Sequence, residues 1–136
     1  DILTINELEL RLIGKKKSLH DCLKVLTNDI GIKFLIVKRG SGGSLLVTKK
    51  SFDWVPSYPF CDVVDPTGAG DSYAGALFSS LDILTSLTSK SIIDSMVYAS
   101  ALSSFTIESF GVDSLLKLKK KDILKREREL RKIARI

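Results

Sequence analysis

The fold is decided by the stretch Cys61-Asp62-Val63-Val64-Asp65-Pro66-Thr67-Gly68-Ala69-Gly70-Asp71-Ser72-Tyr73-Ala74-Gly75. We predict a short apolar strand at 62–64, then a turn, then the first turn of a helix. Gly68 and Gly70 permit backbone conformations closed to other residues and a close approach to a ligand. A helix N-terminus offers unpaired N–H groups and a positive dipole end, which together bind anions. Asp71 adds a carboxylate beside this predicted anion site, as a base for phosphoryl transfer requires.

Two better-known glycine motifs do not occur in this sequence. A Walker A loop needs G-x-x-x-x-G-K-[ST], and no run of that form is present. The dinucleotide fingerprint G-x-G-x-x-G needs Gly or Ala at position 73, where this chain has Tyr73. The second glycine cluster, 40–43, would need Gly at position 45 and has Leu45. Neither a P-loop nor a dinucleotide-binding domain is therefore indicated.

Residues 65–75 resemble the C-terminal signature of the ribokinase-like (PfkB) family of carbohydrate and nucleoside kinases. The core of that signature is D-x-T-G-A-G-D, followed by small and aromatic residues, and all of it is present here. The resemblance implies that Gly68, Ala69 and Gly70 donate backbone N–H groups to the transferring phosphate. It also implies that Asp71 is the catalytic base. The alternative is a glycine-rich helix start with no ligand.

The length and the start of the chain predict part of a larger domain. With 136 residues the chain is one domain or less. It begins with Asp1 and its only methionine is Met96, so we expect the natural start to lie outside this sequence. Members of the family are longer. We therefore predict that 1–136 is the C-terminal part of a single ribokinase-like kinase domain, without the N-terminal substrate-binding part and its lid.

The composition argues against several other classes of protein. No run of about 18 apolar residues is present, so no membrane-spanning helix is predicted. The two cysteines, Cys22 and Cys61, have no metal-ligand spacing and suit a reducing cytosol. With His20 as the only histidine, a transition-metal site is not indicated. We therefore expect a cytoplasmic protein.

The positive charge of the chain belongs to its C-terminal tail. Residues 117–136 hold ten Lys or Arg against three acids, a local +7, so the +5 of the whole chain leaves −2 for the rest. Basic helices can bind nucleic acid or an anionic membrane surface. Here acids interrupt the run and no aromatic residue is interleaved. We therefore predict a helix at 119–136 packed on the sheet, with neither nucleic acid nor membrane as a partner. Its apolar positions are Ile123, Leu124, Leu130, Ile133 and Ala134.

Two interpretations are open for the first helix of the chain. Residues 2–5 predict a short buried strand, and Asn6 opens a helix that ends at Gly14, which we predict as its C-cap. Asn6 and Glu9 resemble the family's N-x-x-E motif, which implies that they act through water on magnesium and the phosphates. The same pair also fits a capping box, in which Asn caps the helix and Glu reaches back to it.

The segment 18–37 predicts a helix followed by a buried strand. Residues 18–29 have helical spacing, and four apolar residues in a row at 34–37 predict a strand buried on both faces of a parallel sheet. The apolar stripe of the helix consists of Leu19, Cys22, Leu23 and Leu26. Cys22 is therefore expected in the core.

A glycine loop at 38–43 precedes a predicted strand at 44–48. In the family a corresponding loop, T-x-G-x-x-G, lies along the nucleotide. Gly40 and Gly43 match its two glycines, and Lys38 replaces the usual Thr. The resemblance implies that Gly40 and Gly43 contact the nucleotide, and a lysine at 38 is able to pair with a phosphate as a point charge. The alternative is an ordinary hairpin turn with Lys38 in solvent.

Two long helices are predicted after an irregular aromatic strand at 51–60. The first runs from 71 to near 84 with an apolar stripe of Ala74, Leu77, Phe78 and Leu81. In the second, Ile93, Met96, Val97, Ala101, Ser104 and Phe105 line one side. In the family the second helix helps to bound the adenine pocket. The resemblance therefore makes Ala99, Ser100 and Ser103 candidates for nucleotide contact.

The segment Glu108-Ser109-Phe110-Gly111 resembles an E-x-F-G segment that lies near the nucleotide in many sugar kinases. Gly111 would let the backbone approach the base or a bound monovalent cation. In some members, backbone oxygens of the signature's leading Asp and of this loop hold potassium, which implies Asp65 and Thr67 here. The alternative for Gly111 is a plain helix C-cap.

Together these features predict an α/β fold, namely the C-terminal half of a ribokinase-like three-layer α/β/α sandwich with its nucleotide-binding region. The expected function is ATP-dependent phosphorylation of a sugar or nucleoside hydroxyl, with Mg2+ and, as in some members, K+. The expected partners are the sugar or nucleoside substrate, the N-terminal half of the same kinase, and a second copy in a homodimer. The alternative is a non-catalytic nucleotide-binding or regulatory protein of kinase ancestry, against which the intact Asp71 argues.

Overall fold

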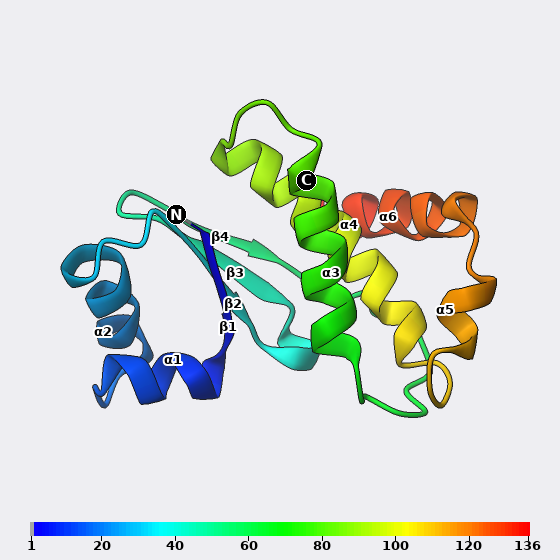
Figure 1. The fold of residues 1–136 in the computed structure, drawn as a ribbon, viewed down its shortest axis with the longest axis horizontal. Coiled ribbons are helices and arrows are strands. Elements are labelled where there is room, and N and C mark those ends of the chain that lie inside the picture. The colour runs from blue at the N-terminus through cyan, green and yellow to red at the C-terminus, as the bar shows by residue number, and fades with distance from the viewer. Residues whose placement is uncertain (1) are drawn as a thin grey trace. The chain divides into compact units, whose positions relative to one another are not determined.

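Residues 2–136 are described by a computed structural model (Figure 1). They divide into two units, Asp1–Trp54 and Val55–Ile136. The first unit carries nearly all of the sheet and two helices, and the second carries the remaining helices. No helix within 2–136 has the length and apolarity needed to cross a bilayer.

The sheet has four strands, which lie in the order of the sequence: β1 (Ile2–Asn6), β2 (Phe34–Lys38), β3 (Ser44–Val47) and β4 (Phe52–Val55). β1 and β2 are parallel, and Asn6 lies opposite Lys38 at the end of the pair. β2 and β3 are antiparallel, with Lys38 opposite Ser44. The glycine loop therefore joins neighbouring antiparallel strands, as a hairpin does.

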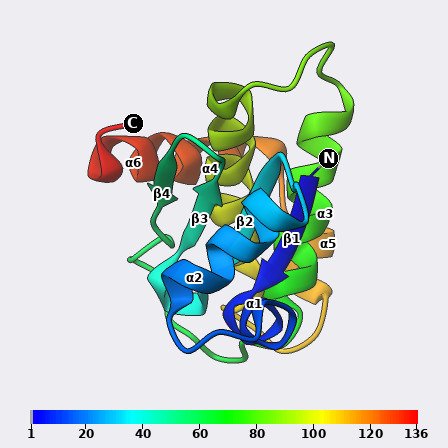
Figure 2. The same ribbon diagram turned by 90° about the vertical axis from the view of Figure 1, so that its left-hand side faces the viewer.

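Two helices lie on one face of this sheet (Figure 2). They are α1 (Glu7–Gly14) and α2 (Leu19–Lys24), and α2 continues into a π-helical turn, Val25–Asp29. Their apolar side chains meet those of the strands in one cluster, which removes apolar surface from water. The buried members of the cluster are Ile5, Leu10, Cys22, Leu23, Leu26, Leu35, Val37 and Val47. The predicted stripe and the buried position of Cys22 are confirmed.

Strand β2 is buried on both faces, as its four apolar residues predict. Successive side chains of a strand point to opposite faces. Leu35 and Val37 face the helices, while Phe34 and Ile36 on the other face are also buried. The parallel pairing with β1 completes the βαβ arrangement expected for an α/β protein.

The end of α1 differs from the prediction. Gly14 is the last helical residue, and Lys15 takes the left-handed conformation after it, with φ 49°. The N–H of Lys15 donates to the carbonyl of Arg11 over 3.0 Å. Gly14 is needed for a different reason, because a Cβ there would lie 2.6 Å from the Cβ of Cys22. It is a packing glycine, not a cap.

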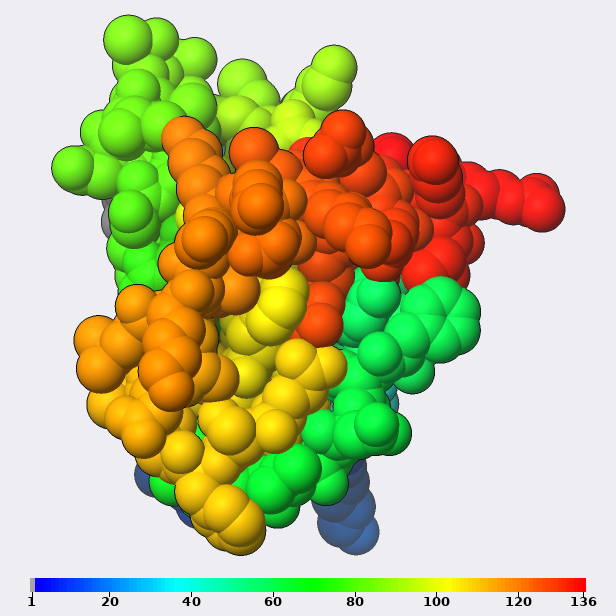
Figure 3. All heavy atoms as spheres, turned by 90° about the vertical axis from the view of Figure 1, so that its right-hand side faces the viewer, coloured from blue at the N-terminus to red at the C-terminus, as the bar shows by residue number. Residues whose placement is uncertain are grey.

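The second unit is built on helix α4 (Ser89–Thr106). Helices α3 (Ala69–Asp82) and α6 (Lys120–Ala134) both pack against it, and the short helix α5 (Asp113–Lys117) lies between α4 and α6 in the chain (Figure 1). The space-filling view shows the end of α4, in yellow, bordered by α5 and α6, in orange and red (Figure 3). Because α4 has neighbours on several sides, its buried residues are not confined to one stripe. They include Ile92, Ser95, Met96, Val97, Ala99, Ala101 and Ser104.

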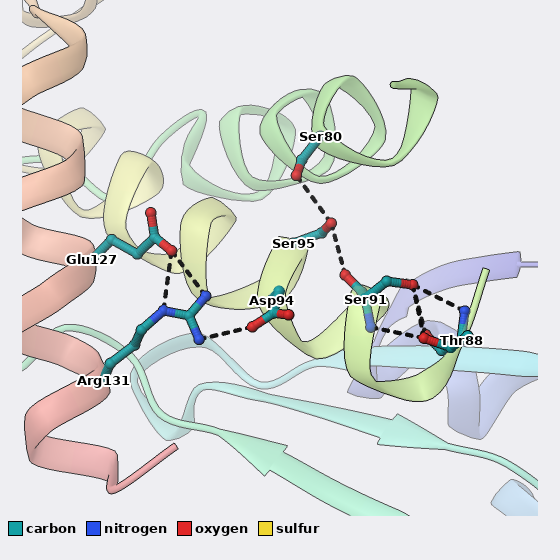
Figure 4. Close-up of polar contacts among 7 residues, drawn as sticks. All are labelled: Ser80, Thr88, Ser91, Asp94, Ser95, Glu127 and Arg131. Carbon is teal, nitrogen blue, oxygen red and sulfur yellow. Dashed lines mark hydrogen bonds and ion pairs between the residues drawn. The ribbon is translucent and has the colours of Figure 1, made fainter. Parts of the chain in front are cut away.

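Polar contacts also join the helices of this unit (Figure 4). The hydroxyls of Ser80 on α3 and Ser95 on α4 lie 3.0 Å apart. Arg131 on α6 pairs with Asp94 on α4 at 2.8 Å and with Glu127 on its own helix at 2.9 Å. α4 and α6 are thereby tied at a point remote in sequence from the signature.

Two expectations for this unit are wrong. Residues 62–64 form no strand, and Val63 is 63% exposed, because this stretch bonds to the end of α4 and not to the sheet. The apolar stripes are also narrower than predicted. α3 buries Tyr73, Ala76, Leu77 and Leu81, whereas Phe78 is 44% exposed. On α6 only Ile123 and Leu130 are buried, and Leu124 and Ile133 are exposed.

Gly14→Ala is expected to destabilise the protein. The added methyl group overlaps the Cβ and Cα of Cys22, and forcing atoms into a packed core costs about 1–3 kcal/mol. Urea unfolding would measure this loss as a lower transition midpoint at an unchanged slope.

Gly75→Ala is the matched control, since the residue is helical and no neighbouring heavy atom of 2–136 lies within 4 Å of the place that an alanine Cβ would take. Alanine there should leave stability unchanged or raise it by up to about 1 kcal/mol. Equal effects of the two variants would refute the packing role of Gly14.

Candidate functional site

The signature turn has the geometry of an anion-binding helix start. Gly68 is the N-cap of α3 and takes a left-handed conformation, with φ 81° and ψ −7°. No side chain caps this helix. Within 2–136 the N–H groups of Gly68 and Gly70 have no hydrogen-bond partner, whereas that of Ala69 donates to the carbonyl of Pro66 over 3.3 Å. The turn therefore presents free donors at the positive end of a helix dipole.

The backbone conformation requires glycine at position 68 but not at position 70. A side chain at Gly68 would be strained at its positive φ, although the nearest atom, Cγ2 of Thr106, is 3.7 Å from the Cβ position. Gly70 lies within the first turn of α3 and does not have a positive φ. The prediction that both glycines take special conformations is therefore wrong for Gly70. Its small size still leaves the turn open to a ligand.

Asp71 lies in the first turn of α3, and its side chain is exposed. Within residues 2–136 the carboxylate has no hydrogen-bond or ion-pair partner. It stands three positions after the N-cap glycine, so the free carboxylate and the free N–H groups belong to the same turn. A carboxylate with no bound proton donor is available to accept a proton from a bound hydroxyl.

The turn before Gly68 is held to the end of α4. The N–H groups of Val64 and Asp65 both donate to the carbonyl of Ile107, over 2.8 and 3.1 Å. The carboxylate of Asp65 then accepts from the N–H of Thr67 over 2.9 Å, and this bond lowers the pKa of Asp65. Asp65 is thus occupied in shaping the turn, while the exposed Thr67 precedes the cap.

The loop after α4 holds Gly111 in a left-handed conformation, with φ 68°. The C-cap interpretation of Gly111 is wrong, because α4 ends at Thr106 and Ile107 is its C-cap. The hydroxyl of Thr106 is buried and has no hydrogen-bond partner within 2–136. Of the Thr106 side chain, only the methyl group lies within 4 Å of the place that a Cβ on Gly68 would take, at 3.7 Å, so the buried unpaired oxygen is farther from the turn. Such an oxygen is available to a cation or a water molecule.

Ser100 and Ser103 lie on α4 but point to different partners. Ser100 is buried and donates to the carbonyl of Pro56 over 2.9 Å. Ser103 is half-buried and donates to the carbonyl of Ser100 within the helix over 3.2 Å. Ala99 is fully buried. Nucleotide contact by these residues remains a prediction.

In the first unit, Asn6 and Glu9 form a complete capping box. The amide oxygen of Asn6 accepts from the N–H of Glu9 over 2.8 Å, and the Glu9 carboxylate accepts from the N–H of Asn6 over 2.7 Å. The capping interpretation is therefore confirmed, and the magnesium role remains a prediction. Both residues are exposed, and no group of three metal-ligating acids, His or Cys occurs within 2–136.

The 38–43 loop is shaped by two glycines and held by two side-chain contacts. Gly40 and Gly43 both have positive φ, 55° and 79°, as a turn built on glycines requires. The indole N–H of Trp54 donates to the carbonyl of Gly42 over 2.8 Å. Arg39 pairs with Glu7 at 3.0 Å, and Arg11 and Arg39 together lower the pKa of Glu7. Lys38 ends β2 and is half-buried.

The structure thus brings the predicted residues together in two sets. In the second unit the turn 65–71 lies against the end of α4, and in the first unit Asn6 lies beside Lys38. The carbonyl of Ile107 and the indole of Trp54 were not predicted as parts of these sets. Every residue has a backbone carbonyl, so the residue type at 107 does not indicate its role as an acceptor. The aromatic residues around Trp54 likewise do not indicate the hydrogen bond from its indole to Gly42.

Comparison with known proteins finds similar kinases over most of the chain. The family described as pfkB family carbohydrate kinase matches residues 1–119. The bifunctional ribokinase/ribose-5-phosphate isomerase A of Fructilactobacillus sanfranciscensis is 35% identical over 119 residues, which are 84% of this chain and 21% of that protein.

Solved structures show the same fold. Ribokinase of Arabidopsis thaliana, complexed with ribose and ATP, has a TM-score of 0.76 and 26% identity over 93% of this chain and 40% of that one. A fructokinase double mutant of Vibrio cholerae, with fructose, ADP and potassium bound, has a TM-score of 0.80 and 22% identity over 91% and 39%. The mixed α/β fold of ribokinase-like kinases, over their C-terminal portion, is therefore confirmed. The chain spans about 40% of the length of these structures.

Asn6→Ala is expected to lower the free energy of unfolding by about 1 kcal/mol, because the N-cap hydrogen bond of α1 is lost. Asn6→Asp keeps an oxygen at the same position and should change stability by only a few tenths of a kcal/mol. Chemical denaturation of both variants measures this difference.

The aspartate variant also separates the two interpretations of Asn6. If the residue acts only as a cap, Asn6→Asp should bind nucleotide and Mg2+ as the wild type does. Altered binding at unchanged stability would establish a role beyond capping, and a stable Asn6→Ala variant would refute the cap.

Proposed function

The chain belongs to the pfkB family of carbohydrate kinases, and from this premise we propose that the full-length protein is an ATP-dependent phosphotransferase acting on a hydroxyl of a sugar or nucleoside. The observation that carries the proposal is the turn 68–71. It places free N–H groups and a free carboxylate at one helix start.

Phosphoryl transfer needs little covalent chemistry from the protein, and positioning and electrostatics supply most of the acceleration. In the proposed reaction the acceptor hydroxyl attacks the γ-phosphorus of ATP. The new O–P bond forms as the bond to the leaving ADP breaks, and the hydroxyl proton passes to Asp71. Gly68, Ala69 and Gly70 stabilise the charge on the transferring group through backbone N–H groups and the helix dipole. Ala69 supports this assignment least, because its N–H already donates to the carbonyl of Pro66 over 3.3 Å.

The nucleotide is proposed to lie along the other glycine positions of the family pattern. Gly40 and Gly43 would contact the nucleotide and Lys38 would pair with one of its phosphates, while Gly111, with Ser100 and Ser103, would approach the adenine. Support comes from the positive φ of Gly40, Gly43 and Gly111, a conformation that favours glycine, so that no side chain obstructs a ligand there. Ser100 supports this assignment least, because its hydroxyl is already bonded to Pro56.

Two cations are proposed as cofactors. Mg2+, when bound to the phosphates of ATP, neutralises their charge, and Asn6 and Glu9 would hold its water ligands. Both side chains are exposed and keep atoms free from the capping box, which fits a contact through water. K+ is proposed next to Asp65 and Thr67, since the fructokinase structure contains potassium and the hydroxyl of Thr106, the last residue of α4, is buried and unpaired within 2–136.

The remaining partners are also proposals. Because the chain spans only part of its relatives, the N-terminal half of the kinase is proposed to supply the lid and most contacts with the sugar or nucleoside. A homodimer and a cytoplasmic location remain predictions from the sequence.

Asp71→Asn is expected to abolish phosphoryl transfer, since a positioned base contributes about 10²–10⁴ in rate. The substitution removes the base but keeps the size of the side chain, so ATP affinity should be largely retained. The assay is ATP consumption by the full-length protein with Mg2+ against pooled sugars and pooled nucleosides, together with ATP binding by calorimetry.

Ser72→Ala, at the next position of the same turn, is the control and should keep activity. Near-normal turnover of Asp71→Asn would exclude Asp71 as the base. ATP binding by the wild type without turnover on any pool would favour the non-catalytic nucleotide-binding protein.

A further inference from the structure

Arg126 is held on α6 between two aromatic rings. Its guanidinium carbon lies 3.5 Å from the ring centroid of Phe105 and 4.6 Å from that of Tyr58. The side chain is 14% exposed, so the charge is largely removed from water. Guanidinium groups stack well on aromatic faces, and such contacts strengthen when they are desolvated.

The same guanidinium also makes hydrogen bonds at the end of α4. One nitrogen donates to the hydroxyl of Ser104 over 2.8 Å. The other donates to both carboxylate oxygens of Glu108, over 3.1 and 3.2 Å. Charge-assisted bonds of this kind are the stronger class, and the planar group fixes direction as well as distance. Arg126 thus holds the turn 107–108 from one side.

The other side of this turn holds the signature loop, residues 62–70, which leads into α3. Ile107, next to Glu108, accepts the hydrogen bonds from the N–H groups of Val64 and Asp65. Asp65 then accepts from Thr67, which directly precedes Gly68. Every step from Arg126 to the anion turn is therefore a hydrogen bond or a peptide linkage within the second unit.

The segment leading into the loop is fixed to the same helices. Tyr58 contacts Arg126 through its ring and donates its hydroxyl to Glu129 on α6 over 2.7 Å, which raises the pKa of Tyr58. The carbonyl of Pro56 accepts from Ser100. The segment before the signature loop is thus held by Ser100 of α4 and by Arg126 and Glu129 of α6. The segment after α4 is held by Arg126.

We propose that Arg126 is a positioning residue for phosphoryl transfer, acting through Glu108 and the carbonyl of Ile107 on the placement of the N–H groups at 68–70. The inference rests on the proposed function. It gives α6 a role in the reaction, although that helix contributes no residue to the candidate site. Without the pairing, the turn 107–108 loses its fixed partner and the loop samples positions in which its donors miss the phosphoryl oxygens.

The chain offers a matched control in Arg131. It lies on the same helix, is also partly buried, and is also ion-paired, with Asp94 on α4 and Glu127 on α6 (Figure 4). These two partners lie outside the segment that contains the loop, 56–71, and outside the segment to which the loop is bonded, 104–111. Arg126→Met and Arg131→Met therefore remove the same charge from the same helix, but only the first releases the loop.

The test measures steady-state kinetics of both variants in the full-length protein. Arg126→Met should lower kcat by about ten- to a hundredfold, since a displacement of about 1 Å can cost 10²-fold. The KM for the acceptor should stay within about twofold, because ground-state binding of the acceptor is not involved. Arg131→Met should keep kcat. Arg126→Lys should recover only part of the loss, since an ammonium cannot replace the planar fork.

Hydrogen exchange gives a second measurement that needs no activity. Peptides covering 62–70 should exchange faster in Arg126→Met than in the wild type and should be unchanged in Arg131→Met. If Arg126→Met does not fold, Glu108→Gln, which leaves Arg126 in its aromatic stack, should show the same kinetic and exchange changes.

The two proposals fail separately. A wild type that binds ATP but transfers no phosphate overturns the proposed function, and exchange at 62–70 still decides whether Arg126 holds the loop. Equal changes in the two methionine variants, or a lowered stability with unchanged kcat and exchange, overturn the role of Arg126.

Discussion

The carbonyl oxygen of Ile107 holds the segment that leads into the anion-binding turn 68–71, and the geometry of that turn depends on it. It accepts two N–H groups from the segment that leads into the anion turn, so the end of α4 and the start of α3 are joined there. The segment 62–65 has no strand partners, and this pair of bonds replaces the ladder that a strand would have given it. Backbone donors can stabilise a developing charge only if their positions are fixed beforehand. Fixing them through one carbonyl makes the turn sensitive to whatever holds residues 107–108.

This dependence changes the significance of the basic C-terminal helix. Its lysines and arginines make the chain basic, yet the side chains that tie the helix to the unit are two arginines in ion pairs, Glu129 in its hydrogen bond with Tyr58, and two buried apolar residues. Exposed ion pairs contribute little to stability, whereas a largely desolvated arginine between rings contributes more and fixes orientation. The two arginines carry the same charge but have different partners. Arg126 pairs with Glu108, which adjoins the carbonyl that holds the loop, whereas the partners of Arg131 lie outside the segments 56–71 and 104–111.

The sequence predicted the structure correctly where the residue type itself determines the conformation or the burial. The motif around Gly68 predicted the left-handed helix start, and the apolar run 34–37 predicted a doubly buried strand. It failed at Val63 and Val64, because their apolar character indicates a strand while the bond to Ile107 leaves no trace in the sequence. It also failed at Phe78, whose spacing fits the buried stripe although the residue is exposed in this chain. Periodicity cannot distinguish a face covered here from one that other parts of a longer protein would cover.

The two interpretations of Asn6 and Glu9 are compatible, since they use different atoms. The capping box engages the amide oxygen of Asn6 and one carboxylate oxygen of Glu9. Within 2–136, the amide nitrogen of Asn6 and the second oxygen of Glu9 have no partner, and both side chains face solvent. The cap therefore fixes the rotamers of two polar groups while leaving one functional atom of each available. A ligand contact made by such groups costs less conformational entropy than one made by free side chains, because that entropy was already lost when the helix formed. A structural motif in this position is thus a reason to expect a well-defined water-mediated contact, and not an argument against one.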